Sequence, residues 1–308
     1  MAQLDYLALR YASRRTLKLD VAVSIALRMG IFQICHLDRI PVHAAVSESV
    51  ELVKWAGKRS AAGLVNAILR KVNREPVEWP DREKALSCPE WLLTRWSREY
   101  GEVNARKIAL AALEEPKTYL RGDRVQDIGA QSVVPWLELR EGERFLDLCA
   151  APGNKTVQAL ETPLRAVACD LHAHRLGGLE SLNIPLVRLD AEKPLPFAPG
   201  SFDKILVDVP CSGTGTLGRN PEIKWRLVPD DLEALATVQR AILRNALAVL
   251  KSGGRAVYST CSLEAQENKA VLERVLALLP EYSVVQQDQR LPGREEGDGF
   301  YTAVIVRK

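Results

Sequence analysis

The chain has 308 residues, a length that at about 100–200 residues per domain predicts two domains. Its composition, 47% hydrophobic and 26% charged, is typical of globular proteins and excludes disordered, collagen-like and fibrous chains. No apolar run reaches the ~18 residues that cross a bilayer, since Arg28 interrupts the best candidate, Val21 to Ile34. The start, Met1 to Arg10, carries Asp5 and lacks an apolar segment, so we expect no secretory signal, no membrane partner and a cytoplasmic location.

The net charge of +3 is divided unevenly along the chain. Residues 1–80 hold 12 Lys and Arg against 7 Asp and Glu, whereas residues 81–308 hold 30 against 32. The stretch from Leu52 to Arg74 is rich in cations and contains no acidic residue. Such a stretch predicts either a phosphate-binding surface or a solvated helix face. The candidate RNA-binding cations within it are Lys58, Arg59, Arg70 and Lys71.

Six cysteines, at positions 35, 88, 149, 169, 211 and 261, are never closer than 20 residues. No C-x-x-C pair exists, so a compact zinc site is not expected and we predict no bound metal. Without a secretory signal, a disulfide framework is not expected either. Each cysteine is therefore either a small buried apolar residue or a reactive thiol.

The first part of the chain is predicted to be helical, because apolar residues recur there at helical spacing. Gly57 fits a C-cap, and prolines at positions 76, 80 and 89 punctuate a connecting stretch. We predict a helical domain over 1–78 and a helical linker region over 79–123. The predicted helices are 21–34, 44–56, 61–72, 89–100 and 102–115.

From about Arg144 short apolar strands alternate with helices, which is typical of an α/β domain whose parallel sheet is covered on both faces. Ligands bind such sheets beyond the carboxyl ends of the strands, where the strand order reverses. We predict this domain over 124–308. The predicted strands are 144–149, 165–170, 185–190, 203–209, 255–260, 282–285 and 301–307, and the predicted helices are 155–161, 172–183, 230–250 and 264–279.

A turn of small residues follows the first of these strands, with the sequence Asp147-Leu148-Cys149-Ala150-Ala151-Pro152-Gly153-Asn154-Lys155-Thr156. It is neither a Walker A loop nor a G-x-G-x-x-G turn. Small residues let backbone amides and a helix N-terminus approach a ligand, although an ordinary strand-to-helix turn has the same pattern. Asp170 and Asp190 end the next two strands, where carboxylates can face a ribose and an adenine. The combination favours an adenosine-containing cofactor.

Two cysteines follow later strands at equivalent places. Cys211 stands in the loop Asp208-Val209-Pro210-Cys211-Ser212-Gly213-Thr214-Gly215, and Cys261 stands in Tyr258-Ser259-Thr260-Cys261-Ser262. The helix expected from Glu264 would favour a Cys261 thiolate through its dipole. We therefore expect both thiols and Asp208 to face one pocket.

The segment from Arg219 to Trp225 offers two cations and an indole close to the Cys211 loop. Arg219 and Lys224 suit phosphate contacts, and Trp225 suits either base stacking or anchoring of the loop.

These segments resemble the RNA cytosine-C5 methyltransferases of the RsmB/Sun/Fmu group, which are related to the NOP/NSUN enzymes. The resemblance implies a Rossmann-like class I S-adenosylmethionine-dependent methyltransferase with a seven-stranded, mostly parallel sheet, preceded by an all-α NusB-like RNA-binding domain. The P-C and T-C cysteines are its most specific features. The matching segments are 146–156, 208–215, 223–225, 258–262 and 296–300 in the second part, and 27–30, 39–44 and 57–66 in the first.

The resemblance also implies roles for site residues. Cys261 is implied as a nucleophile that adds to C6 of cytosine, Cys211 as an aid to release of the product, and Asp208 as a hydrogen-bonding partner of the base. The implied substrate is a cytosine in 16S ribosomal RNA, of the position-967 type, in free or early-assembly RNA bound by a monomer. The implied S-adenosylmethionine-binding residues are Cys149, Ala150, Ala151, Pro152, Gly153, Asn154, Lys155, Asp170, Asp190 and Asp208.

The chain departs from the family pattern at three places. Relatives usually begin earlier, and they place several tens of residues, an RRM-like subdomain, where Asp123 here runs almost directly into Val125. That difference concerns how RNA is positioned, not the cofactor site. Asn154 also stands where glycine is more usual.

Three other functions fit parts of the sequence. An amino-group methyltransferase would carry an Asp-Pro-Pro-aromatic loop, and Cys211 at the aromatic position argues against it. A ribosome-assembly factor with a vestigial methylase domain is disfavoured, because the expected polar and thiol positions are all retained. A transfer-RNA cytosine-C5 methyltransferase is the third alternative.

Overall fold

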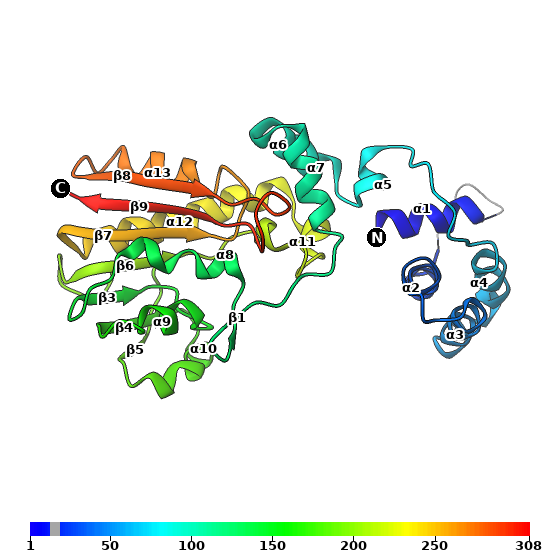
Figure 1. Ribbon diagram of the computed structural model, residues 1–308, viewed down its shortest axis with the longest axis horizontal. Helices are drawn as coiled ribbons and strands as arrows, with labels where there is room; N and C mark the ends of the chain where they lie inside the picture. The colour runs from blue at the N-terminus through cyan, green and yellow to red at the C-terminus, as the bar shows by residue number, and fades with distance from the viewer. Residues whose placement is uncertain (13–18) are drawn as a thin grey trace. The chain divides into compact units, whose positions relative to one another are not determined.

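The computed structural model describes residues 1–12 and 19–308, which form two compact units, Met1–Leu93 and Thr94–Lys308 (Figure 1). The division after Leu93 falls fifteen residues beyond residue 78, where the first boundary was predicted. In the part of the chain that the structure describes, no helix is both long and apolar enough to cross a membrane.

The first unit is a bundle of short helices around one apolar core. Its longest helix, α2, begins after Asp20, whose carboxylate accepts a hydrogen bond of 2.9 Å from the Ala22 N–H. Gly57, with φ of +75°, ends α3 in the left-handed conformation expected of a C-cap glycine. The helices of this unit are α1 (Ala2–Tyr11), α2 (Val21–His36), α3 (Val42–Trp55), η1 (Arg59–Ala61), α4 (Ala62–Leu69) and α5 (Arg82–Leu86).

The second unit starts with short elements, the first of which begins before the division, at Glu90. Helices α6 (Glu90–Tyr100) and α7 (Glu102–Ala111) are followed by a two-stranded hairpin, in which β1 (Leu120–Arg121) pairs with β2 (Arg124–Val125). Gly122 has φ of +58° at the hairpin turn, which favours glycine there. This tight hairpin occupies the place where relatives are expected to carry an inserted subdomain. Helices α8 (Ile128–Gln131) and η2 (Val134–Leu137) come next.

The centre of the second unit is a seven-stranded sheet of order β5-β4-β3-β6-β7-β9-β8. The pairs β5–β4, β4–β3, β3–β6 and β6–β7 are parallel, whereas β9 is antiparallel to both of its neighbours, β7 and β8, so the predicted mostly parallel sheet is confirmed. The strand order reverses between β3 and β6, where a crevice opens beyond the strand ends. The strands are β3 (Arg144–Asp147), β4 (Arg165–Asp170), β5 (Leu186–Arg188), β6 (Phe202–Asp208), β7 (Leu250–Thr260), β8 (Tyr282–Gln289) and β9 (Tyr301–Arg307).

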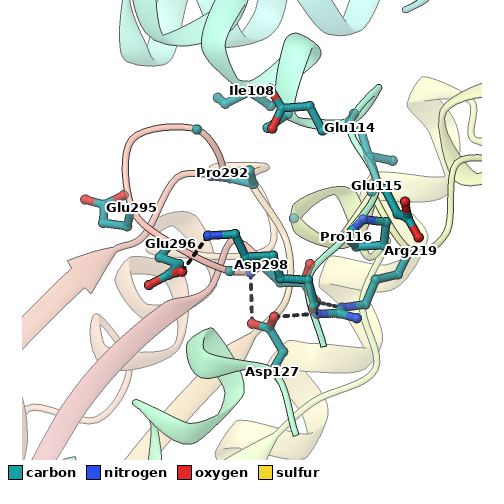
Figure 2. Close-up of a pocket in the computed structure, with 18 of the residues that line it drawn as sticks. Ile108, Glu114, Glu115, Pro116, Asp127, Arg219, Pro292, Glu295, Glu296 and Asp298 are labelled. Atoms are coloured by element: carbon teal, nitrogen blue, oxygen red, sulfur yellow. Dashed lines mark hydrogen bonds and ion pairs between the residues drawn. The ribbon is translucent and has the colours of Figure 1, made fainter. Parts of the chain in front are cut away.

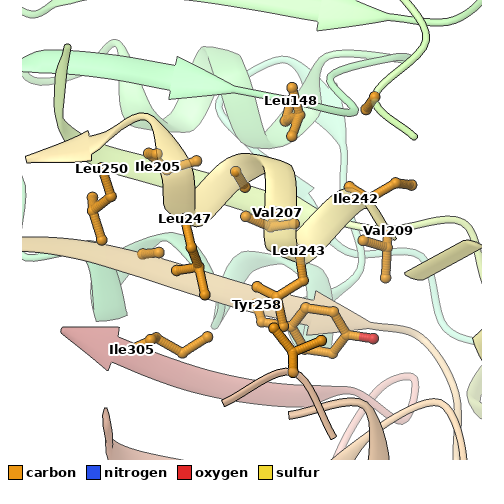
Figure 3. Close-up of a cluster of buried hydrophobic side chains, with 14 of the residues drawn as sticks. Leu148, Ile205, Val207, Val209, Ile242, Leu243, Leu247, Leu250, Tyr258 and Ile305 are labelled. Carbon is orange, nitrogen blue, oxygen red and sulfur yellow. The ribbon is translucent and has the colours of Figure 1, made fainter. Parts of the chain in front are cut away.

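Helix α12 (Pro229–Ala248) covers one face of this sheet. Its apolar stripe packs on side chains of the central strands, with Leu243 and Leu247 facing Val207 and Tyr258 (Figure 3). The Tyr258 hydroxyl is satisfied inside this core, because it donates a 2.6 Å hydrogen bond to the Glu267 carbonyl. The remaining helices are α9 (Asn154–Ala159), α10 (Ala173–Leu176), η3 (Gly177–Leu182), η4 (Thr214–Thr216), α11 (Ile223–Arg226) and α13 (Lys269–Leu276).

Two predicted helices differ from the structure. The helix expected over 172–183 is a short α-helix followed by a 3-10 segment. The helix expected from Glu264 begins only at Lys269, because side-chain hydrogen bonds of Ser262, Glu267 and Asn268 hold the preceding residues in a loop. The prediction that a helix N-terminus stands directly beside Cys261 is therefore wrong.

Truncation of the core should weaken the second unit. Leu243 is fully buried beneath the sheet, so Leu243→Ala is expected to lower the free energy of unfolding by about 2–5 kcal/mol through lost burial and a cavity. Urea unfolding followed by circular dichroism measures this. Leu278→Ala is the control, because Leu278 is 75% exposed and its truncation should change stability by less than about 0.5 kcal/mol. Equal effects of the two substitutions would contradict the assigned core.

Candidate active site

Two thiols meet beyond the carboxyl ends of β6 and β7. These strands are parallel neighbours, and Asp208 pairs in register with Ser259, so the loops that follow them start side by side. Cys211 stands three residues after β6 and Cys261 directly follows β7. Their Sγ atoms lie 3.3 Å apart, and both side chains are half-buried. The structure thus brings together the two cysteines that the sequence singled out.

Asp208 lies at the end of β6, held between a cation and a hydroxyl. Its Oδ2 accepts a 2.7 Å hydrogen bond from Lys155 Nζ, and its Oδ1 accepts one of 2.5 Å from the Ser259 hydroxyl. Burial acts to lower the pKa of Lys155, but the Asp208 carboxylate raises it above its ordinary value. Lys155 therefore stays charged, with its ammonium group 4.9 Å from the centre of the Phe300 ring.

The environments of the two thiols favour a proton on Cys211. The hydrogen bond with Cys261 and burial both raise the pKa of the Cys211 thiol well above its ordinary value. Cys261 Sγ lies 3.3 Å from Cys211 Sγ, within reach of a hydrogen bond donated by the Cys211 thiol.

A cavity of about 340 Å³ connects the thiols to the ends of β3, β4 and β5. Asp170, at the end of β4, is buried and accepts hydrogen bonds from the Ala151 N–H (3.2 Å) and the His172 N–H (2.9 Å). Asp190 follows β5 and is half-buried. The polar and thiol groups lining this cavity are Cys149, Asp170, His172, Arg175, Asp190, Glu192, Asp208, Cys211 and Cys261.

The small-residue turn lies beside this cavity and needs its glycine. Gly153 has φ of +104°, and a Cβ added there would lie 1.9 Å from Leu179 Cδ2. The neighbouring Asn154 replaces the glycine more usual in the family. Its side chain donates a 2.9 Å hydrogen bond to the Val125 carbonyl, so it joins the turn to the β1–β2 hairpin.

Asp147, at the end of β3, lies beside the small-residue turn but is not among the site residues predicted from the sequence. Its Oδ2 accepts a 2.7 Å hydrogen bond from Thr156, whereas its buried Oδ1 has no hydrogen-bond partner among the described residues. Burial raises the pKa of this carboxyl to about 7. Asp147 lines a cavity of about 260 Å³ together with Cys149–Lys155 and Asp208. An unpaired buried acceptor fits a ligand that carries an ammonium group.

The two predicted phosphate contacts after the Cys211 loop are placed differently from expectation. Arg219 lies between two carboxylates, 2.9 Å from Asp127 Oδ2 and 3.0 Å from Asp298 Oδ2 (Figure 2). Lys224 is only 3% exposed. Neither side chain is an exposed cation, because Arg219 pairs with Asp127 and Asp298 and Lys224 is buried.

The four predicted cations of the first unit are all exposed. Lys58 forms a 2.8 Å ion pair with Asp20, and Arg70 Nε donates to the Asn66 side chain at 3.1 Å. They lie on and beside η1 and α4. The positions are accessible to a large anionic partner.

Comparisons with known proteins agree with this geometry. The family model of 16S rRNA methyltransferase RsmB/F matches residues 134–306, and the NusB family model matches residues 1–74. Proteins named ribosomal RNA small subunit methyltransferase B, from Shigella flexneri serotype 5b and Escherichia coli O1:K1, are 32% identical over 377 residues. These matches cover 100% of this chain and 87% of each relative. Since the matched length exceeds 308 residues, both relatives carry residues that this chain lacks.

Solved structures show the same fold. The crystal structure of PH0851 superposes with a TM-score of 0.79 at 21% identity, covering 99% of this chain and 88% of that one. NSun6 from Pyrococcus horikoshii with SFG is 27% identical, with a TM-score of 0.53 over 59% of this chain and 52% of that one. S-adenosylmethionine is the cofactor of this methyltransferase family.

The buried Asp147 carboxyl predicts a pH dependence of stability. Its pKa rises from 3.8 to about 7 on folding, so between these pH values the folded state binds more protons than the unfolded one. The contribution of this carboxyl to stability should therefore fall as pH rises through this window, by at most about 1.4 kcal/mol for each pH unit. Asp147→Asn should remove that contribution and make the decline of stability shallower than in the wild type in urea titrations at a series of pH values, whereas Asp38→Asn, at an exposed site, should leave the decline unchanged. Parallel curves for all three proteins would contradict the assignment.

Proposed function

Because the chain belongs to the RsmB/F family of 16S rRNA methyltransferases, we propose that it methylates C5 of a cytosine in small-subunit ribosomal RNA. The expected target is of the position-967 type. The observation that carries the proposal is the pair of thiols 3.3 Å apart in a cavity that also contains Asp208. Transfer to an amino group needs no thiol, whereas C5 of cytosine is too weak a nucleophile without one.

Cys261 is the proposed nucleophile. Its thiolate forms a bond to C6 of the cytosine while the C5=C6 double bond breaks, and the electron pair of that bond makes C5 nucleophilic enough to take a methyl group. S-adenosylmethionine would supply that methyl group from its sulfonium, whose carbon–sulfur bond breaks to leave S-adenosylhomocysteine. The target base must leave its stack to reach the thiol. The Lys155 ammonium, 2.7 Å from Asp208, adds positive charge where negative charge develops.

Asp208 is the proposed partner of the base. Lys155 and Ser259 donate to the Asp208 side chain and orient it, which suits acceptance of a hydrogen bond from the cytosine amino group. After methylation, a base removes the C5 proton and the C6–sulfur bond breaks, which frees Cys261. Cys211 is the proposed aid to this release, acting through an ordered water or on the C5 proton itself, which requires that the Cys211 thiol has first given up its own proton.

The cofactor is proposed to lie along the turn Cys149–Lys155, with Asp170 facing its ribose and Asp190 its adenine. The unpaired Oδ1 of Asp147 fits the ammonium group of its methionine part. The exposed cations Lys58, Arg59, Arg70 and Lys71 are proposed to contact RNA phosphates, with the chain acting as a monomer.

The two thiols predict opposite phenotypes. Cys261→Ala should abolish methyl transfer and leave S-adenosylmethionine affinity unchanged. Cys211→Ala should accumulate a covalent protein–RNA adduct that resists denaturant, because the bond between Cys261 and C6 still forms but breaks slowly. Cys35→Ala should be fully active, since Cys35 lies in the other unit. Reversed phenotypes would contradict the roles, and normal transfer in both variants would contradict cytosine-C5 chemistry altogether.

The exposed cations predict a salt dependence. Replacing Lys58, Arg59, Arg70 and Lys71 by Ala should weaken RNA binding and flatten the dependence of log K on log salt by about 0.7–0.9 for each RNA phosphate that is no longer neutralised. Filter binding across a salt series measures this. Lys269→Ala removes an exposed cation of the other unit and should leave the slope unchanged. An unchanged slope in the fourfold variant would contradict the proposed surface.

The test of the whole proposal is a map of 5-methylcytosine in ribosomal RNA from cells with and without the protein. Loss of one modified small-subunit cytosine supports it. A shift in melting temperature with S-adenosylmethionine, but no transfer to unmodified RNA, would instead indicate an RNA-binding assembly factor.

A further inference from the structure

Each active-site cysteine is followed by a serine, and both serines point to one buried carboxylate. Ser212 follows Cys211, Ser262 follows Cys261, and their hydroxyls lie 3.1 Å apart. Both donate hydrogen bonds to Oε2 of Glu267, the one from Ser262 at 2.5 Å. Glu267 is fully buried and does not touch either thiol sulfur in any described hydrogen bond. The two cysteine loops therefore meet at a single side chain.

The second oxygen of Glu267 binds the Cys211 loop from another side. Oε1 accepts hydrogen bonds from the Ser212 N–H at 2.8 Å and from Gln239 Nε2 at 2.9 Å. The Gln239 amide also donates to the Pro210 carbonyl at 2.9 Å, on the residue before Cys211. The carboxylate thus accepts four hydrogen bonds, three of them from serines adjacent to the cysteines.

Glu267 is itself held in place. The Tyr258 hydroxyl donates to its carbonyl at 2.6 Å, and its own N–H donates to the Glu264 carbonyl at 2.9 Å. The next residue, Asn268, donates to the Ser262 carbonyl and accepts from the Thr260 hydroxyl. The chain on both sides of Cys261 is therefore attached to the turn that carries Glu267.

A buried carboxylate is costly unless its oxygens are satisfied, and an apolar side chain of similar size would pack as well. The described donors to the Glu267 carboxylate are the serines of the two cysteine loops and Gln239 of α12, which also donates to the Cys211 loop. We propose that Glu267 is a positioning residue that joins the two cysteine loops and fixes the distance between Cys211 Sγ and Cys261 Sγ. This inference rests on the proposed function for its catalytic meaning, but the distance itself can be tested without methyl transfer.

Disulfide formation with oxidised glutathione reports that distance. One thiolate attacks oxidised glutathione and releases one reduced glutathione. The second thiolate then attacks the protein sulfur of the mixed disulfide, which releases the second glutathione and leaves a Cys211–Cys261 bond. The rate of this second step, compared with attack by an external thiol, gives the effective concentration of one cysteine at the other.

Glu267→Ala should lower this effective concentration at least about tenfold, because the loops lose their common anchor. Glu267→Gln should fall between Ala and the wild type, since its carbonyl keeps two donors and its amide can donate to the serine hydroxyls, which also accept. Because Gln has the shape of Glu, it provides the test if the Ala variant does not fold. S-adenosylmethionine affinity should be unchanged in every variant, which verifies that each one folds.

Glu264 provides the matched control. It is equally buried and lies three residues away, but its oxygens accept from Arg95 Nε at 2.8 Å and Trp96 Nε1 at 2.9 Å, not from the serines. Glu264→Gln and Glu264→Ala should therefore destabilise the protein and leave the effective thiol concentration within twofold of the wild type.

Methyl transfer supplies the second measurement. The Glu267 variants should lose kcat about tenfold or more with little change in KM for RNA, because they displace reacting groups without removing groups that bind the RNA. If wild-type protein methylates no cytosine, the disulfide rates still decide the role of Glu267. If the Glu267 variants close the disulfide as fast as wild type, or if the Glu264 variants are equally slow, the inference is overturned whether or not the protein is a methyltransferase.

Discussion

The parallel pairing of β6 with β7 is the constraint on which the site depends. Their register places Asp208 opposite Ser259, so two loops that are fifty residues apart in the sequence begin next to each other. One loop contributes Cys211 and the other contributes Cys261. Loss of this pairing would separate the thiols, the carboxylate and the hydroxyl that the proposed chemistry uses together. The large buried cluster under α12 stabilises this pair of strands.

Around these strand ends, buried charges are arranged so that most of them have partners. Lys155 and Asp208 form a pair 2.7 Å apart, Arg219 joins Asp127 and Asp298, and Glu267 accepts four hydrogen bonds. Burial and the nearby Asp127 raise the pKa of Asp298 to about 6, although Arg219 acts to lower it. Among the described residues, Asp147 is one exception, because its Oδ1 has no hydrogen-bond partner in the cavity that it lines with the turn Cys149–Lys155. Such an acceptor suits the ammonium group of the proposed cofactor.

Much of the fold could be predicted from the sequence because its elements are locally encoded. Apolar runs bounded by Gly, Pro and Asp identified all seven strands, and helical spacing identified α2, α3 and α12. The start of α13 could not be predicted, because Ser262, Glu267 and Asn268 form hydrogen bonds that hold 262–268 in a loop. The ion pairs of Arg219 and the burial of Lys224 were also missed, since their partners and surroundings come from distant segments.

The cysteines, the acidic strand ends, the small-residue turn and the resemblance to a family could be recognised from the sequence, because these are properties of short segments and of residue types. The three-dimensional structure was needed to show that the thiols lie 3.3 Å apart, that Lys155 faces Asp208, and that one buried carboxylate joins the two cysteine loops. Such distances depend on strand register and on packing between segments far apart in the chain. They cannot be predicted from local composition, because the position of one loop relative to the other depends on how their strands pair.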